Sequence, residues 1–171
     1  MLDIRRFLAS IAAIALCGVS LFAAPAAASA RSCNTAATGA WSNNCTVSEG
    51  DSSHMVEVIQ MIVQSQEVCV PDGVNVDGIF GPKTFNGVEC FQRFNGIQID
   101  GIVGPQTWGT LQSALFKCSA VDGWQYWSPI YPCPGVSGHT DPIRYWINTG
   151  KWYILSPISN TWRRLDTGAP S

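Results

Sequence analysis

A nine-residue stretch of the chain is written twice. VDGIFGPKT at residues 76–84 returns as IDGIVGPQT at residues 99–107, with six of the nine positions identical. In each copy Asp-Gly predicts a tight turn, because glycine readily adopts the positive φ that other residues avoid. An apolar side chain then points inward, Ile79 or Phe80 in the first copy. Gly-Pro predicts a helix start, since the residue before proline is extended and proline suits the first helical position. The chain must therefore hold two helices that are entered through the same turn.

Three helices are predicted around these two copies. Val56, Ile59 and Val63 recur at helical spacing and predict a first helix of about four turns, capped by Ser52 or Ser53. The second and third helices are expected over residues 82–94 and 105–116, with buried sides formed by Phe85, Val88, Phe91, Phe94, Trp108, Leu111 and Leu115.

The first thirty residues predict a secretory signal peptide. Arg5 and Arg6 form a charged start, residues 7–22 an apolar core, and Ala28-Ser29-Ala30 an A-x-A cleavage site. A membrane anchor is the weaker alternative, because the apolar run is Ala-rich, interrupted and short for a span. We therefore expect cleavage after Ala30 and a secreted, extracellular protein that associates with the cell wall.

The net charge excludes some partners. Without the predicted signal peptide the chain carries 10 − 2 = 8 Lys and Arg against 12 − 1 = 11 Asp and Glu, a net charge of −3 with His neutral. No basic stripe is present to bind a phosphate backbone, so nucleic acid is not an expected partner. A weakly acidic protein is also not attracted to an anionic membrane surface. We expect no membrane association after signal removal.

The cysteines predict disulfides. Seven cysteines are present, and removing Cys17 with the signal peptide leaves six, which in an exported chain predicts three bridges with 15 possible pairings. No C-x-x-C pair is present, so a zinc site is not favoured. Each nearest-neighbour bridge would close a loop of about 12 to 22 residues and contribute about 3 kcal/mol. The expected pairs are Cys33 with Cys45, Cys69 with Cys90, and Cys118 with Cys133.

Composition divides the rest of the chain into three segments. Residues 31–52 are small and polar and predict a linker or a disulfide-closed loop. Residues 53–117 carry the helical periodicity, and residues 118–171 are rich in Trp, Tyr and turn residues. The predicted fold class is α+β: a small three-helix bundle followed by a small antiparallel, aromatic-rich β module, stapled by disulfides.

The β module contains a predicted hairpin. Residues 148–150, Asn-Thr-Gly, fit a three-residue turn with glycine in the left-handed position. That turn sets Trp146 opposite Trp152 and Tyr145 opposite Tyr153, and such aromatic pairs stabilise a two-stranded ribbon by about 0.2–1 kcal/mol each.

The β module also contains two similar seven-residue stretches. WQYWSPI at residues 124–130 is followed by WYILSPI at residues 152–158, and residues 162–165 predict one more strand.

Two interpretations of the module's nine Trp and Tyr residues stay open. In one, the rings form the core of a small sheet, which needs a large buried area per residue. In the other, some rings lie on an outer face and stack on sugars. The predicted hairpin puts Tyr145 and Tyr153 on one side and Trp146 and Trp152 on the other, and these four are the possible sugar-stacking residues.

Four motifs follow one another through the helical segment. They are the first helix with Val58-Ile59-Gln60 and Val63, the first repeated loop, Phe91-Gln92, and DGIVGPQTW at residues 100–108. In this order they resemble the peptidoglycan-binding domain family that accompanies many bacterial cell-wall hydrolases. The resemblance covers about residues 53–117 and does not extend into the C-terminal part. It implies a compact three-helix fold that recognises cell-wall glycopeptide without cleaving it.

The resemblance also places a ligand groove along the paired loops. A structural interpretation stands beside it for every candidate: the aspartates brace their turns, the threonines cap helix amides, and the aromatic side chains fill the core. The side chains there that could bind an amide or hydroxyl, or offer an apolar face, are Asp77, Phe80, Thr84, Gln92, Asp100, Thr107 and Trp108.

No catalytic arrangement is recognisable in the sequence. His54 and His139 are too few for the usual three-ligand zinc site. A glycosidase needs two facing carboxylates, whereas residues such as Glu57, Glu67, Asp77 and Glu89 are scattered along the chain. With the cysteines oxidised, no thiol nucleophile remains. We therefore expect a protein that is not an enzyme and that needs no metal or cofactor.

The sequence thus predicts a secreted, non-catalytic, carbohydrate-binding protein of bacterial type that recognises peptidoglycan through its helical domain. Two alternatives stay open. One is a peptidoglycan hydrolase whose activity lies in the C-terminal module, and the other is a secreted interaction or inhibitory protein without glycan affinity. Neither the bound moiety, glycan strand or stem peptide, nor the oligomeric state follows from the sequence.

Overall fold

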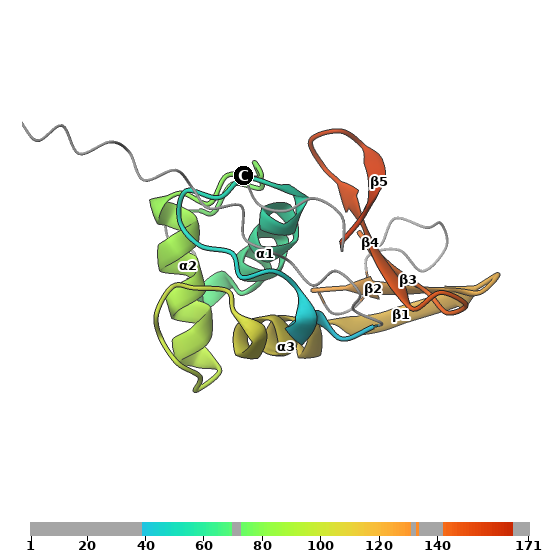
Figure 1. Cartoon of the computed structure of the whole chain (residues 1–171), viewed down its shortest axis with the longest axis horizontal. Coiled ribbons are helices and arrows are strands. Elements are labelled where there is room, and N and C mark those ends of the chain that lie inside the picture. Colours follow the sequence, from blue (N-terminus) through green and yellow to red (C-terminus); the bar gives the residue numbers. More distant parts are fainter. Residues whose placement is uncertain (1–38, 70–72, 131–132, 134–141, 166–171) are drawn as a thin grey trace, which may run out of the picture.

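A computed structural model describes residues 39–69, 73–130, 133 and 142–165. The predicted signal peptide, its cleavage at Ala30, Cys33 and His139 lie outside these residues. The α+β class is confirmed (Figure 1). In chain order the elements are η1 Trp41–Asn43, α1 His54–Ser65, η2 Glu67–Cys69, α2 Pro82–Phe94, α3 Pro105–Ser113, β1 Phe116–Val121, β2 Trp124–Ser128, β3 Ile143–Trp146, β4 Lys151–Ser156 and β5 Thr161–Arg164.

The helices gather on one side of the molecule and the strands on the other (Figure 1). Helix α1 lies between α2 and the sheet, and it packs against both α2 and β4. Helix α3 packs chiefly against η1 instead of against the other two helices. The prediction of a three-helix bundle is therefore not confirmed, although the three α-helices themselves are present.

Both copies of the repeated loop start a helix as predicted. Gly81 and Gly104 occupy the N-cap positions of α2 and α3 with extended backbones, φ −94° and −91°, and a proline follows each at the start of its helix. Gly78 and Gly101 adopt φ values of 73° and 66°, the left-handed region expected of the Asp-Gly turns. Helix α3 ends at Ser113, earlier than expected, because the chain becomes extended and enters β1.

Helix α1 is tied to the first copy of the loop. Ser53 occupies its N-cap position, but the Ser53 side chain makes no capping hydrogen bond. The Ser53 N–H donates to the Gly78 carbonyl at 3.0 Å, and the Ser53 carbonyl accepts from the N–H of Val56 and Glu57. The start of α1 is therefore held against the first Asp-Gly turn by backbone hydrogen bonds.

The sheet is an antiparallel meander in the order β1-β2-β3-β4-β5. Its β3–β4 register differs from the predicted hairpin by one residue: Tyr145 pairs with Trp152, and Trp146 pairs with Lys151. The reason is the turn, which spans residues 147–150, with the Gly150 N–H donating to the Trp146 carbonyl at 2.9 Å. A turn of four residues in place of three moves every pairing by one position.

The similarity between residues 124–130 and 152–158 has a structural explanation. Ser128 ends β2 and Ser156 ends β4, and each is 1% exposed. The Ser128 hydroxyl accepts from the Ile130 N–H at 3.1 Å, and the Ser156 hydroxyl accepts from the Ser159 N–H at 3.2 Å. Each serine thus closes the turn that follows its strand.

Trp41, Cys45 and Val47 are part of the core, although they lie in the segment predicted as a polar linker or a disulfide-closed loop. Trp41 is 1% exposed, and its ring meets Trp108 of α3 and Trp152 of β4 edge-on, with centroids 5.9 and 5.4 Å away. The Gly39 carbonyl accepts from Gln112 Nε2 and Trp152 Nε1, each at 2.8 Å. One tryptophan in an otherwise polar stretch therefore joins the helices to the sheet.

Residues 47–51 also pair with both copies of the repeated loop. Val47 and Val103 form an antiparallel bridge with N–H to oxygen distances of 3.1 and 2.8 Å. The Phe80 N–H donates to the Asp51 carbonyl at 2.8 Å, and the Phe80 carbonyl accepts from the Gly50 N–H at 2.9 Å. One short segment, which contains a turn at residues 48–51, thus holds the apolar residue of each loop in place.

The hydrophobic core continues across the predicted boundary between residues 117 and 118. The division of the chain into two domains there stays a prediction, and separate folding of the two parts would split this cluster. The cluster includes Trp41, Val47, Met55, Val56, Ile59, Ile62, Phe80, Phe91, Val103, Trp108 and Leu111 from the N-terminal and helical segments, and Ile143, Trp152, Ile154 and Leu165 from the C-terminal part.

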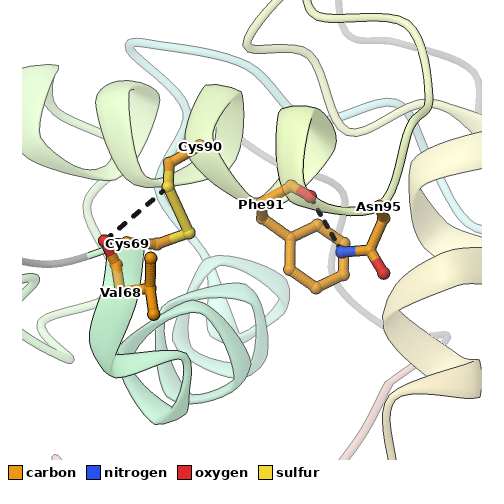
Figure 2. The surroundings of a disulfide bond; sticks show 5 residues. All are labelled: Val68, Cys69, Cys90, Phe91 and Asn95. Carbon is orange, nitrogen blue, oxygen red and sulfur yellow. Dashed lines mark hydrogen bonds between the residues drawn. A yellow bond between two sulfur atoms is a disulfide. The ribbon is translucent and has the colours of Figure 1, made fainter.

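Two of the three predicted disulfides are present. Cys69 bonds to Cys90 with a Cα–Cα distance of 5.3 Å, and Cys118 bonds to Cys133 at 5.6 Å. Figure 2 shows the first bridge joining η2, after α1, to the middle of α2. Cys45 is disulfide-bonded as well, and its predicted partner Cys33 lies outside the described residues.

Candidate functional site

A buried glutamine on α1 holds the first copy of the repeated loop. Gln60, which is 1% exposed, donates from Nε2 to Asp77 Oδ1 at 2.8 Å, to the Ile79 carbonyl at 3.0 Å and to Thr84 Oγ1 at 3.0 Å. Its Oε1 accepts from the N–H groups of Asp77 and Gly78 at 3.0 and 2.9 Å. The side-chain amide therefore satisfies the turn, the residue after it and the start of α2 together.

Gln92 on α2 does the same for the second copy. Its Nε2 donates to Asp100 Oδ1, the Ile102 carbonyl and Thr107 Oγ1 at 2.9, 2.9 and 3.1 Å. Its Oε1 accepts from the N–H groups of Asp100 and Gly101 at 3.0 and 2.9 Å. Each loop is therefore held by one buried glutamine with five hydrogen bonds, an arrangement that we call a glutamine bracket. In both cases the glutamine comes from the preceding helix.

Each aspartate braces its own turn as well. Asp77 Oδ1 accepts from the Ile79 N–H, and Asp100 Oδ1 accepts from the Ile102 N–H, both at 2.9 Å. The hydrogen bond from Ile79, with further bonds from Gln60 and from its own N–H, lowers the pKa of Asp77 below the usual value of 3.8, against an opposing effect of burial. Asp77 is therefore held as an ionised carboxylate at neutral pH.

These contacts give an internal role to each predicted ligand-binding residue. Thr84, Gln92 and Thr107 are 3%, 0% and 5% exposed, and Phe80 and Trp108 are 1% and 0% exposed. The Trp108 ring N–H donates to the Cys45 carbonyl at 2.7 Å. The hydroxyls of the two threonines, the amide of Gln92 and the two aromatic rings are therefore used inside the fold. Contact of these five residues with a ligand stays a prediction. Asp77 and Asp100 are less buried than the other five.

The possible sugar-stacking residues divide between the two faces of the sheet, although not as predicted. The observed register puts Tyr145 and Trp152 on the face toward the core, where their ring centroids lie 4.9 Å apart. Trp146 and Tyr153 lie on the opposite face, because neighbouring residues of a strand alternate.

On the outer face of the sheet, the Arg144 side chain lies among aromatic rings. The Arg144 guanidinium lies 4.0 Å from the ring centroid of Trp124 and 3.8 Å from that of Trp162, with Tyr153 at 5.5 Å. Partial burial lowers the pKa of Arg144, against an opposing effect of Tyr126. A cation between indole faces is favourable. One face of each of these two indoles is thus occupied by the protein itself, which leaves less ring surface for a sugar.

A pocket of about 420 Å³ lies where the helical part meets the sheet. It is lined by the first turn of α1, by the first Asp-Gly turn and by the segment from the β4–β5 turn into β5. Its lining includes Ser53, His54, Glu57, Asp77, Ile79, Ile158 and Arg163.

Glu57 is the most unusual residue of this pocket. It is 6% exposed, and within the described residues its Oε2 makes no hydrogen bond and is itself inaccessible. The Ser53 Oγ, one turn earlier, is also buried and makes no hydrogen bond within the described residues. Buried polar atoms of native proteins normally have partners, so both residues line the pocket with a polar atom whose hydrogen-bonding capacity is unused.

Sequence reasoning missed Gln60 as a bracket and Glu57 as a pocket residue. The signal for Gln60 was its counterpart Gln92, which was selected through the Phe91-Gln92 pair. The distances along the chain hide the equivalence, since Gln60 is 17 residues before Asp77 whereas Gln92 is 8 residues before Asp100. Glu57 and Asp77 are scattered along the sequence, yet both line one pocket.

The described residues contain neither a membrane-spanning helix nor a cluster of metal ligands. No helix among them is both long and apolar enough to cross a membrane. No group of three or more His, Cys, Asp or Glu side chains in the same part of the chain could hold a metal ion.

Comparison with known proteins agrees with the resemblance noted in the sequence. The family described as "Putative peptidoglycan binding domain" matches residues 70–111, which include both copies of the loop and Gln92. A solved structure of a peptidoglycan-binding protein from Clostridioides difficile, in complex with glutamine hydroxamate, is 35% identical over 39% of this chain and 39% of that chain, with a TM-score of 0.34. No curated protein matches the sequence.

Proposed function

We propose that this protein is exported and binds peptidoglycan, without cleaving it, through the helical segment of residues 53–117. The family match over residues 70–111 is the observation that carries the proposal. The match supports peptidoglycan as the partner and a location outside the cell, and the disulfides agree with an oxidising compartment.

The paired brackets supply the rigidity that such binding needs. Gln60 and Gln92 fix two loops with five hydrogen bonds each, so the loop backbones are held in one conformation before any ligand arrives. A preorganised surface loses less entropy on binding than a mobile one. Of the seven predicted ligand-binding residues, Asp77 alone lines the pocket of about 420 Å³. We propose Asp77 as the contact retained from that set.

Sedimentation with purified insoluble peptidoglycan tests the proposal. The full chain should pellet with the wall and remain in solution without it. A protein with scrambled disulfides, refolded from the same preparation, serves as the control for adhesion of exposed apolar surface. If native and scrambled protein pellet to the same extent, binding is non-specific and the proposal is wrong.

A hydrolase is the second candidate function, because Glu57 and Asp77 line the same pocket. Two carboxylates that face a substrate are the minimum for glycoside hydrolysis. Release of dye from labelled wall, measured in the same tubes, separates the candidates. Pelleting without release supports a binding protein, and release that Glu57→Gln abolishes supports a hydrolase. If the protein neither pellets with the wall nor releases dye, the result supports an interaction or inhibitory protein.

A further inference from the structure

We infer that the pocket at the start of α1 binds an amino-acid head group, meaning one carbon that bears both a primary ammonium and a carboxylate. This inference rests on the proposed function and names the moiety: the stem peptide of peptidoglycan, in the type whose diamino acid has a second carboxylate and so carries such a group, and not the glycan strand.

The first observation is the state of the Glu57 carboxylate. Glu57 is buried to 6% exposure, and its Oε2 makes no hydrogen bond within the described residues. Leaving a buried carboxyl oxygen without a hydrogen-bond donor is costly, and a ligand N–H would remove that cost. The Ser53 Oγ nearby is likewise buried without a partner, although an N-cap serine usually accepts from its own helix.

The second observation is the distribution of charge around the pocket. Two carboxylates, Glu57 and Asp77, lie on its helix and loop side. Arg163 lies on its sheet side and is exposed. Its Nε donates to the Ser159 hydroxyl at a long 3.4 Å, which leaves guanidinium donors for an anion. The ligand that complements this arrangement has its ammonium at the buried end, toward Glu57, and its carboxylate at the rim, toward Arg163.

The third observation is what the lining does not contain. No Trp, Tyr or Phe is among the described residues that line the pocket, so these residues offer no aromatic ring on which a sugar could stack. The apolar part of the lining comes from Ile79 and Ile158, which are 58% and 60% exposed. Aliphatic side chains at the mouth suit the methylene and methyl groups of a peptide.

The pocket depends on contact between segments far apart in the chain. A side-chain carbon placed on Gly78 would lie 3.4 Å from Glu57 Cγ and 3.5 Å from Ile158 Cδ1. The first loop is therefore in close contact with α1 on one side and with the turn after β4 on the other. The site combines the helical segment with the sheet, so the full chain is needed to form it.

The experiment uses the full chain and two soluble probes. One probe is a synthetic stem tetrapeptide with a free ammonium and carboxylate on its diamino acid, and the other is the same peptide acetylated at that amine. Binding is measured by calorimetry. The free peptide should bind at least about tenfold more tightly than the acetylated one, since acetylation removes the charged donor for Glu57.

Glu57→Gln should lower the affinity for the free peptide by about tenfold or more and leave the weak affinity for the acetylated peptide unchanged. Glu49→Gln, the same change at an exposed position outside the pocket, is the matched control. Arg163→Gln tests the other end and should act on a peptide with a free carboxylate but not on its amide. Because Glu57 Oε2 has no internal partner, Glu57→Gln should also leave the melting temperature unchanged or raise it.

Three results would overturn the inference. One is equal binding of the free and acetylated peptides. Another is a Glu57→Gln affinity equal to that of Glu49→Gln. The third is a clear drop in melting temperature for Glu57→Gln, which would assign Glu57 to stability. If the protein still pellets with the wall in any of these cases, the proposed function stands and only the stem-peptide site is lost. If the wild type does not pellet, the proposed function itself fails.

Discussion

Replacement of Gln92 by methionine tests whether the bracket stabilises the fold. Methionine keeps the length and apolar volume of the side chain but removes both the donor and the acceptor. Gln92 is 0% exposed and makes five hydrogen bonds to the second loop. Its loss leaves the N–H of Gly101 and the hydroxyl of Thr107 without that partner in a buried site.

The magnitude follows from the burial of the five bonds. Two of them, to Thr107 and from Gly101, are fully buried, and a buried group left without a partner costs about 1–3 kcal/mol. The other three are partly buried and contribute about 0.5–1 kcal/mol each. The low ends of these ranges give about 3.5 kcal/mol, and water entering the relaxed loop keeps the cost near that end. We expect Gln92→Met to lower the free energy of unfolding by about 4 kcal/mol.

Urea unfolding of the disulfide-bonded protein, followed by far-UV circular dichroism, measures this quantity. Gln98→Met is the matched control, because Gln98 is exposed and donates one hydrogen bond to the same aspartate, Asp100 Oδ2 at 3.0 Å. It should cost less than about 0.5 kcal/mol. Gln60→Met should match Gln92→Met, since both brackets have the same geometry. A loss below about 1.5 kcal/mol for Gln92→Met would refute the reasoning.

Two further predictions concern the loops. Gly101→Ala should destabilise by about 1–3 kcal/mol or more, because Gly101 has φ +66° and an added Cβ would overlap the Phe85 ring. Gly109→Ala, the same change in α3 with nothing within 4 Å, should instead stabilise by about 0.5–1 kcal/mol, and thermal unfolding of both variants checks the opposite signs. The lowered pKa of Asp77 means that its stabilising effect is complete above the unfolded value near 3.8 and is lost as the pH falls through the lower folded value. The Asp77→Asn variant should therefore lose less stability than the wild type between about pH 4 and pH 2. Urea unfolding at each pH measures this difference, and an equal loss in both proteins would contradict the lowered pKa of Asp77.

Local features of the fold followed from the sequence because their causes are local. An Asp-Gly turn needs one positive φ, and a Gly-Pro helix start needs one extended residue and one fixed φ. These requirements lie within nine residues, so the starts of α2 and α3 at Pro82 and Pro105 were predicted correctly. The Cys69–Cys90 and Cys118–Cys133 bridges followed from pairing of near neighbours.

The hairpin register shows where local reasoning stops. Turns of three or four residues both fit the stretch after Trp146, and the choice moves every pair by one position. Packing of Trp152 against Trp41 accompanies the observed register. Trp41 lies in a stretch whose composition is that of a linker, and its burial depends on α3 and β4, which follow it by more than sixty residues.

The sequence by itself determined the two turn-and-helix units and the family resemblance, because each depends on residues within a few positions of one another. Only the tertiary structure decided which side chains bind these loops and which residues line the pocket beside them. It brings Gln60 onto a turn 17 residues away and Gln92 onto one 8 residues away, which gives one geometry from two unequal spacings. It also places Glu57, Asp77 and Arg163 around one pocket. A helix, a loop and a strand supply these three charges, and no pattern along the chain links positions that only packing of the core brings together.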